Sequence, residues 1–241
     1  MAPPGTDEII TFSYTFAFDD NTKKQFEVVL DAKTLELRSN PSESKPEWTK
    51  LDYYRCDNCP LAGKVDDCPI AVNLATLVKE FKDSMSYENT VVTVRAPERT
   101  YQKKAPVQKG LSSILGIYMV TSNCPVMDQL RPMTRFHLPF ATATETLFRA
   151  VSTYLTAQFF VMREGKKPDW QLTKLIEIYK AVSVVNKGIS QRLARASEKD
   201  ANVNAVIILH SFGDAIPFFI ENGLDEIQYL FSKFMRGDAS K

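Results

Sequence analysis

The sequence predicts an α+β protein with an amino-terminal antiparallel β-sheet, a cysteine-rich crossover and a carboxyl-terminal helical bundle. Three observations predict this class. Residues 10–38 alternate apolar and polar side chains, as half-buried strands do. Residues 142–235 repeat apolar side chains every three or four positions, as amphipathic helices do. Strand patterns come first and helical patterns last, which is typical of an α+β order of elements.

The first half of the chain carries the strand patterns. Phe12, Tyr14 and Phe16 share one parity in the first strand, which predicts one buried face. The turn sequence "DDNTK" joins this strand to the next. In order, we expect strands at 10–19, 23–31 and 35–38, a surface loop at 39–48, a helix at 71–85, a strand hairpin at 89–105 and a helix at 106–120.

The second half of the chain is predicted to be helical. Thr142 and Glu145 form a T-x-x-E capping box at the start of its first helix. The other helices are expected at 169–196, at 200–216 with deeper burial, and at 224–235 after the Asn222-Gly223 break. We expect a β-rich region at 1–125 and a helical bundle at 126–241, packed as one unit.

Length and composition set limits on function. With 241 residues and 44% hydrophobic side chains, the chain can bury a core without disulfides. The 30 basic and 29 acidic side chains nearly cancel, so we do not expect nucleic-acid binding. "MAPPGTDEII" lacks the features of a targeting signal, and the longest uncharged stretch, 110–127, contains polar residues and proline. We expect a cytoplasmic protein without a membrane span.

The four cysteines are the main candidates for chemistry. Cys56 and Cys59 form a C-x-x-C pair. Eight residues separate Cys59 from Cys68, and 55 residues separate Cys68 from Cys124. A C-x-x-C turn presents two sulfur atoms to one ion, and four cysteines complete a tetrahedral set. Proline follows three of the four, which favours extended backbone at those cysteines. The hypothesis is a metal site that holds Zn²⁺ or an iron-sulfur cluster and is structural or regulatory.

Two other interpretations of the cysteines stay open. Cys56 and Cys59 could form a redox pair, although the nearby acidic residues Asp57, Asp66 and Asp67 do not favour a reactive thiolate. The cysteines could also be small buried residues without a ligand. In that case the chain would be a metal-free interaction module. It would dock a protein partner through its helical surface or through the hairpin whose residues 95–109 carry five basic side chains.

A third hypothesis is an enzyme that acts on an anionic substrate. Arg131, Arg135 and His137 follow Cys124 closely and could bind a phosphate or carboxylate. Internal salt bridges to Asp128 or Glu145 are the simpler explanation. The sequence contains no nucleophile-elbow, Walker A or dinucleotide-binding motif, so no catalytic residue is predicted and we do not expect an enzyme.

Several motifs carry a resemblance to a known family. They are "CDNCPL", "CPIAVNL" and "CPVMDQLRPMTRFHLPF", together with "ERTY" and "KDANVNAVIIL". With these motifs the chain resembles a bacterial protein family that is described as a domain of unknown function. The resemblance spans about residues 9 to 235 and implies no established activity, so it assigns no residue a catalytic role.

Overall fold

The computed structural model of the chain describes residues 8–38 and 45–235, and it confirms the predicted α+β class. The chain divides into two compact units that do not follow chain order. The first unit contains Met1–Phe140 and Ala181–His210. The second contains Ala141–Lys180 and Ser211–Lys241, so α4 (Thr173–Ala196) and α5 (Ala201–Glu221) each contribute to both units.

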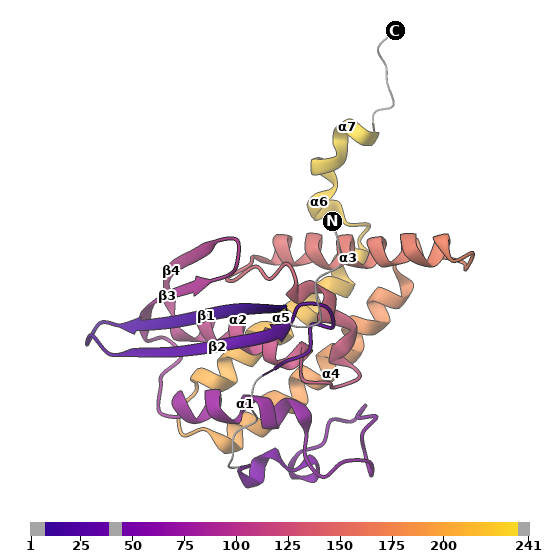
Figure 1. Cartoon of the computed structure of the whole chain (residues 1–241). Coiled ribbons are helices and arrows are strands. Elements are labelled where there is room, and N and C mark those ends of the chain that lie inside the picture. Colours follow the sequence, from indigo (N-terminus) through magenta and orange to yellow (C-terminus); the bar gives the residue numbers. More distant parts are fainter. Residues whose placement is uncertain (1–7, 39–44, 236–241) are drawn as a thin grey trace. The chain divides into compact units, whose positions relative to one another are not determined.

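The first unit contains a four-stranded antiparallel sheet of order β2-β1-β3-β4 (Figure 1). β1 (Ile9–Phe18) pairs with β2 (Lys23–Asp31) and with β3 (Asn89–Arg95), and β3 pairs with β4 (Thr100–Pro106). Both predicted hairpins are confirmed. The strand expected at 35–38 is reduced to one isolated bridge between Leu30 and Leu37. Most of the loop expected at 39–48 lies outside the described residues.

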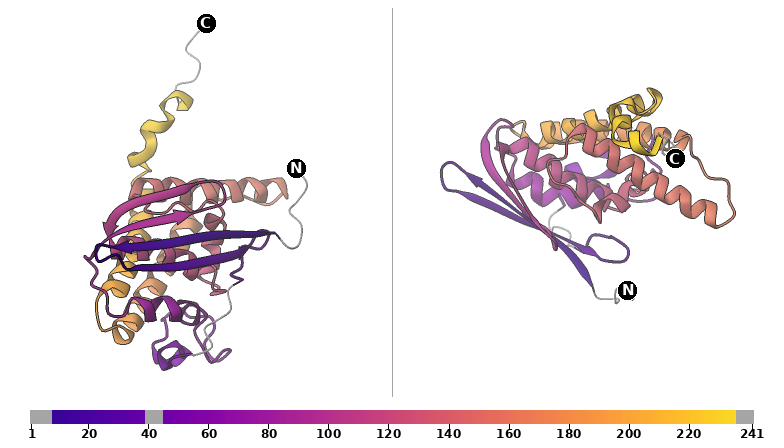
Figure 2. Two further views of the ribbon diagram at one scale, coloured as in Figure 1. Left: turned by 60° about the vertical axis from the view of Figure 1, so that its left-hand side comes forward. Right: turned by 90° about the horizontal axis from the view of Figure 1, so that it is seen from above.

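The sheet buries the face that its alternating pattern predicts. Phe12, Tyr14 and Phe16 of β1 are almost fully buried. α2 (Val107–Val120) contacts β1, β3 and β4, so it lies against this sheet (Figure 2). Gly110 lets α2 approach closely, since a Cβ at this position would lie 2.5 Å from Cε1 of Phe16. The sequence from residue 106 to residue 120 therefore forms the expected helix, and the helix completes the core of the first unit.

α1 (Pro69–Glu80) is shorter than the helix expected at 71–85. Phe81 ends it and packs its ring against Phe16 and Phe26 of the sheet, with ring centroids 5.0 and 5.6 Å away. The helix begins at Pro69, where a proline costs nothing because the first backbone N–H groups of a helix have no partner inside it. The carbonyl of Cys68 accepts the first helical hydrogen bond, from Val72 at 3.0 Å.

The second unit starts with the predicted capping box. The Thr142 hydroxyl accepts a hydrogen bond from the Glu145 backbone at 3.2 Å, and the Glu145 carboxylate accepts one from the Thr142 backbone at 2.8 Å. α3 (Ala143–Arg163) follows. Tyr154 on α3 donates to Asp169 at 2.9 Å. The first contact caps the start of α3, and the second ties its middle to the segment that leads into α4.

Helix boundaries in the second half differ from prediction in three places. α4 begins at Thr173 instead of 169, because Leu172 takes a positive φ of 61°. α5 continues past 216 to Glu221 with Pro217 inside it. The helix expected at 224–235 is broken into α6 (Asp225–Gln228), the 3₁₀ turn Tyr229–Phe231 and α7 (Ser232–Met235). Apolar spacing alone therefore did not locate these ends.

The prediction that α5 is deeply buried is wrong. Ile207 is 44% exposed and Phe218 is 61% exposed. Among the described residues, α5 is the helix whose length and apolar composition would allow it to cross a membrane, and 28% of its apolar window is buried. One such helix is weak evidence for a membrane span, since core helices of soluble proteins pass the same test.

Candidate functional site

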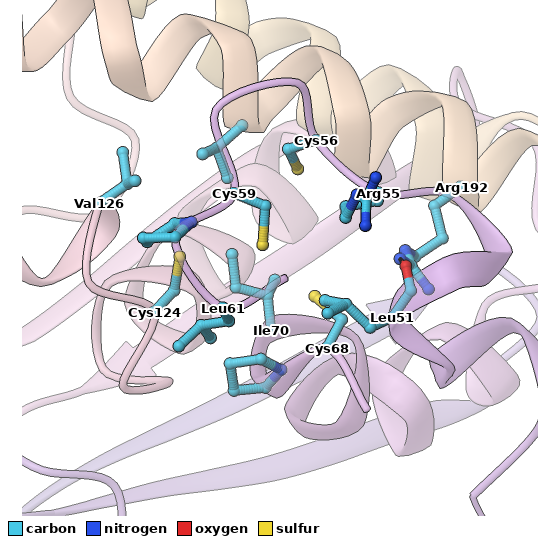
Figure 3. Close-up of a pocket in the computed structure, with 13 residues that line it drawn as sticks. Leu51, Arg55, Cys56, Cys59, Leu61, Cys68, Ile70, Cys124, Val126 and Arg192 are labelled. Atoms are coloured by element: carbon cyan, nitrogen blue, oxygen red, sulfur yellow. Dashed lines mark hydrogen bonds between the residues drawn. The ribbon is translucent and has the colours of Figure 1, made fainter. Parts of the chain in front are cut away.

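The first unit brings all four cysteines to one cavity. Cys56 and Cys59 lie in the turn after the short 3₁₀ helix Leu51–Tyr53, Cys68 lies directly before α1, and Cys124 lies between α2 and the 3₁₀ helix Met127–Thr134. Figure 3 shows their sulfur atoms turned toward the same space. The fold thus brings Cys124 to the other three cysteines, although it is distant from them in sequence.

The turn at Cys56 and Cys59 is closed by a backbone hydrogen bond from the Cys59 N–H to the Cys56 carbonyl, at 3.1 Å. Asn58, within this turn, donates from its side chain to the Ala181 carbonyl of α4 at 2.9 Å. The C-x-x-C pair is therefore held against α4 by a side chain that lies between the two cysteines.

Cys68 occupies the N-cap position of α1. Its backbone N–H donates to the Thr49 carbonyl at 2.8 Å, which fixes the entry into the helix. Burial raises the pKa of the Cys68 thiol, while the backbone N–H groups at the start of α1 and the charge of Arg192 act in the opposite direction. The Cys68 side chain nevertheless forms no capping hydrogen bond with this helix.

Cys124 has the same kind of environment on a different segment. Its backbone carbonyl accepts from Asp128 at 2.9 Å, at the start of the 3₁₀ helix. Burial raises the pKa of the Cys124 thiol, and backbone N–H groups of Met127 and Val126 oppose this shift. Backbone N–H groups thus lie near the sulfur atoms of two cysteines from distant parts of the chain.

The cavity between the cysteines has a volume of about 20 Å³. Apart from the thiols, it is lined by Arg55 and Arg192 and by apolar side chains, among them Leu51, Leu61, Ile70, Val126 and Val185 (Figure 3). A water molecule would fit by size, but it needs two to four polar partners. An apolar hollow bordered by four thiols offers few of them.

Arg192 of α4 is the most unusual side chain at the cavity, because it is 1% exposed. Its guanidinium group donates to the Trp48 carbonyl, to Lys50 at 2.6 Å, to Leu51 at 3.0 Å and to Tyr54 at 2.5 Å. Its Nε is buried without a hydrogen-bond partner among the described residues. These bonds fix the segment that leads into the C-x-x-C turn.

The acidic groups that act most strongly on the charge of Arg192 are thiols and one phenol. Burial lowers the pKa of Arg192, and the groups whose negative charge would act against this most strongly are Cys68, Cys56 and Tyr53. No carboxylate of the described residues is among the strongest of these influences. A buried cation of this kind is stabilised when negative charge lies beside it.

Burial raises the pKa of three of the four thiols, those of Cys56, Cys68 and Cys124. All four are free cysteines. Burial and the neighbouring thiols Cys68, Cys59 and Cys124 raise the pKa of Cys56 to about 12. A redox pair needs a lowered thiol pKa. The environment of Cys56 therefore does not favour the redox interpretation.

The described residues contain no group of three or more His, Cys, Asp or Glu side chains that could hold a metal ion as they are placed. A tetrahedral Zn²⁺ site with bonds of about 2.3 Å needs its sulfur atoms within about 4 Å of one another. The predicted set Cys56, Cys59, Cys68 and Cys124 thus shares one cavity without forming a single-ion site.

Arg131, Arg135 and His137 do not converge on one partner in the described residues. Arg131 forms ion pairs with Asp128 and, at 3.4 Å, with Glu36. Arg135 pairs with Glu98 at 3.3 Å. These contacts favour the internal salt bridges that the sequence offered as the simpler explanation, and binding of an anion here stays a prediction.

His137 instead lies with Tyr14 and Ser113. Its Nε2 is 2.6 Å from the Tyr14 hydroxyl and 3.3 Å from the Ser113 hydroxyl. Burial raises the pKa of Tyr14 far above its ordinary value, so this phenol stays protonated. His137 therefore serves as a hydrogen-bond partner for a buried tyrosine of the sheet.

The second unit exposes large apolar side chains. They are Phe148, Phe159, Phe160, Met162, Trp170, Phe218, Tyr229, Leu230, Phe231, Phe234 and Met235. The interaction-module hypothesis predicts an exposed apolar or basic patch, and these residues agree with that expectation. That hypothesis also predicts thiols that do not cluster, whereas all four thiols line one cavity.

The sequence singled out neither Arg192 nor Gly188, and both residues of α4 lie beside the cysteines. A Cβ at Gly188 would lie 2.6 Å from the Sγ of Cys56, so only glycine allows this thiol to approach the helix. Mid-helix glycine is unfavourable by roughly 0.5–1 kcal/mol relative to alanine. A glycine inside a strong helical pattern was the available signal, although it did not indicate which residue lies against it.

Gly188→Ala is expected to lower the free energy of unfolding by about 1–3 kcal/mol, because the new methyl group displaces Cys56. Urea unfolding measures this loss. The control is Gly116→Ala, whose Cβ would meet Leu209 at an ordinary 3.6 Å. In the Gly188→Ala, Cys56→Ala double variant the clash disappears, so its loss should be smaller than the sum of the two single losses. Additive losses would contradict the assigned contact.

Fold and site together define the chain as an α+β protein with a cysteine-lined cavity beside a buried arginine. Residues 12–232 match the model of the family described as "Domain of unknown function (DUF6901)". This match covers most of the chain, so the chain belongs to that family, as its motifs suggested. Neither the search of curated proteins nor the search of solved structures found a match.

Proposed function

We propose that this chain is a metal-binding protein in which Cys56, Cys59, Cys68 and Cys124 hold one metal centre through four thiolates. The observation that supports the proposal best is the meeting of four thiols and one buried arginine at a single apolar cavity. The positions of the cysteines in sequence do not by themselves bring Cys124 to the other three. The role that we propose is structural or regulatory, in the cytoplasm, where thiols stay reduced.

The electrostatics of the cavity agree with bound thiolates. Four thiolates around a divalent ion leave a net charge of about −2. Arg192 supplies a buried positive charge beside this position, and the acidic groups that act on it most strongly are Cys68, Cys56 and Tyr53. Without a metal, the raised pKa values of Cys56, Cys68 and Cys124 favour their neutral forms, so these three thiols give the arginine no counter-charge. A bound centre would give the buried guanidinium the counter-charge that it lacks.

The backbone around two of the sulfur atoms agrees with the same proposal. Backbone N–H groups of residues 70–71 and 126–127 lie near the sulfur atoms of Cys68 and Cys124 and would favour their charged forms. Such donors stabilise thiolates more strongly than thiols, because a bond to a charged acceptor is the stronger kind. They are also the kind of outer contact that orients metal ligands.

A centre with four protein ligands implies a non-catalytic role. Catalytic zinc sites keep one position open for water or substrate, whereas structural sites are closed by four ligands. The four cysteines come from three separate segments of the first unit, so a shared centre would join them. To form it, the thiols have to adjust from their present positions, since they are not yet placed as a ligand set.

The test is the metal content of protein purified without oxygen. We expect at least about one metal equivalent per chain by elemental analysis. Cys59→Ala and Cys124→Ala should each lose it. Leu61→Ala, which alters the lining of the cavity but removes no ligand, should retain it. Thiol titration under native conditions gives a second measurement, since removal of the centre should make the cysteines more reactive.

Metal content well below one equivalent in the wild-type chain would contradict the proposal. A metal-free interaction module would then be the better interpretation. Retention of metal in both cysteine variants would also contradict it, because the ions would be bound elsewhere.

A further inference from the structure

We propose that the centre is an iron-sulfur cluster rather than a single zinc ion. This inference rests on the four-thiolate centre proposed above and specifies what it holds. The evidence is the combination of a shared cavity with thiols that do not form a single-ion group. A single tetrahedral ion and a cluster make different demands on the distances between sulfur atoms.

The spacing of the thiols favours the larger centre. A single Zn²⁺ draws four sulfur atoms to within about 4 Å of one another. In a cluster the cysteines bind different iron ions, so their sulfur atoms stand farther apart around the inorganic core. Cys56, Cys59, Cys68 and Cys124 surround a common space instead of meeting at one point (Figure 3).

The cavity is small beside a cluster. Its volume of about 20 Å³ is close to the space that one water molecule needs. A cluster would therefore require the four thiols and the apolar lining, among them Leu51, Ile70 and Val185, to move outward as it binds. The proposed function already requires the thiols to adjust from their present positions.

The environment is suited to a cluster. The reduction potential and stability of a cluster depend on hydrogen bonds to its sulfur atoms and on exposure to solvent. Cys68 and Cys124 are both buried, which would shield a cluster from solvent. Proline follows Cys59, Cys68 and Cys124, and a Cys-Pro step also occurs in bacterial iron-sulfur sequences.

The experiment measures iron, zinc and acid-labile sulfide in the full-length protein purified without oxygen. We expect iron and sulfide in equal amounts, at about two to four of each per chain. The protein should show the broad visible absorption of iron-sulfur charge transfer and lose it in air. Cys124→Ala should abolish the absorption, and Leu61→Ala should keep it. An electron paramagnetic resonance signal after reduction with dithionite would support the assignment independently.

The other outcomes separate this inference from the proposed function. About one zinc per chain with no sulfide would overturn the cluster and leave the four-thiolate centre intact. Neither zinc nor iron in stoichiometric amount would overturn both. Iron and sulfide that persist in Cys124→Ala would also overturn the assignment to these cysteines.

Discussion

Replacement of Arg192 by methionine is expected to lower the free energy of unfolding by about 3–5 kcal/mol, because several buried carbonyls lose a charged hydrogen-bond donor. Methionine has a similar length but no donor. The carbonyls of residues 48, 50, 51 and 54 lose the guanidinium group that now satisfies them. A buried acceptor without a partner costs about 1–3 kcal/mol. The loss falls short of four such costs because the segment can open to water.

The control for this substitution is Arg195→Met, three residues further along α4. Arg195 is exposed, and its guanidinium group lies 5.2 Å from the centroid of the Tyr54 ring. An exposed contact of this kind is worth about 0.5–1 kcal/mol. Urea unfolding followed by circular dichroism measures both variants. Equal losses for Arg192→Met and Arg195→Met would show that the buried hydrogen bonds do not stabilise the fold.

An intermediate variant, Arg192→Lys, separates charge from geometry. Lysine keeps the positive charge but has a compact ammonium group that cannot reach carbonyls spread over residues 48–54 in the way that a planar guanidinium group does. We expect a loss between those of wild type and Arg192→Met. If the lysine variant matches the wild type, charge alone accounts for the role of this residue.

The sheet was predictable from sequence because its signals are local. Phe12, Tyr14 and Phe16 show their burial by parity alone, and the turn sequence "DDNTK" sets the β1–β2 hairpin. The capping box at Thr142 was equally local, since both of its partners lie within one turn of helix. The strand expected at 35–38 shortens to one bridge with the nearby Leu30, because Leu35 takes a positive φ of 58° that interrupts the extended backbone.

The helical half was harder to predict because apolar spacing does not report what covers a helix. The apolar run of α5 was interpreted as deep burial, yet Ile207 and Phe218 are exposed. Leu224 takes a positive φ of 61°, and the helix expected from there breaks into short pieces. Leucine at such a position gives no warning in sequence, since glycine is the usual residue there.

The candidate site was only partly predictable. Its four cysteines were found by count and spacing, because few side chains other than cysteine serve that chemistry. Arg192 and Gly188 were missed. Both act through contacts with residues more than a hundred positions away, Arg192 on residues 48–54 and Gly188 on Cys56. One sequence without a fold gives no means to pair such positions.

Loss of the proposed centre is expected to have the largest effect on stability. Metal affinity becomes folding energy, because the ligand set does not exist in the unfolded chain. Stripping the centre from the wild-type protein should therefore lower the free energy of unfolding by several kcal/mol. Unfolding in urea under anaerobic conditions, with and without the centre, measures this difference directly.

Cys68→Ala distinguishes the centre from simple packing. In the stripped protein this substitution removes only a small buried thiol, and we expect a loss of about 1 kcal/mol. Relative to wild-type protein that carries the centre, the same substitution also removes a ligand and with it the centre, so the loss should rise to several kcal/mol. Leu61→Ala should cost the same in both forms, since it removes packing alone. A loss for Cys68→Ala that is equal in the two forms would place this cysteine outside any stabilising centre. The buried charge of Arg192 and the cavity beside it would then not be explained by a shared metal centre.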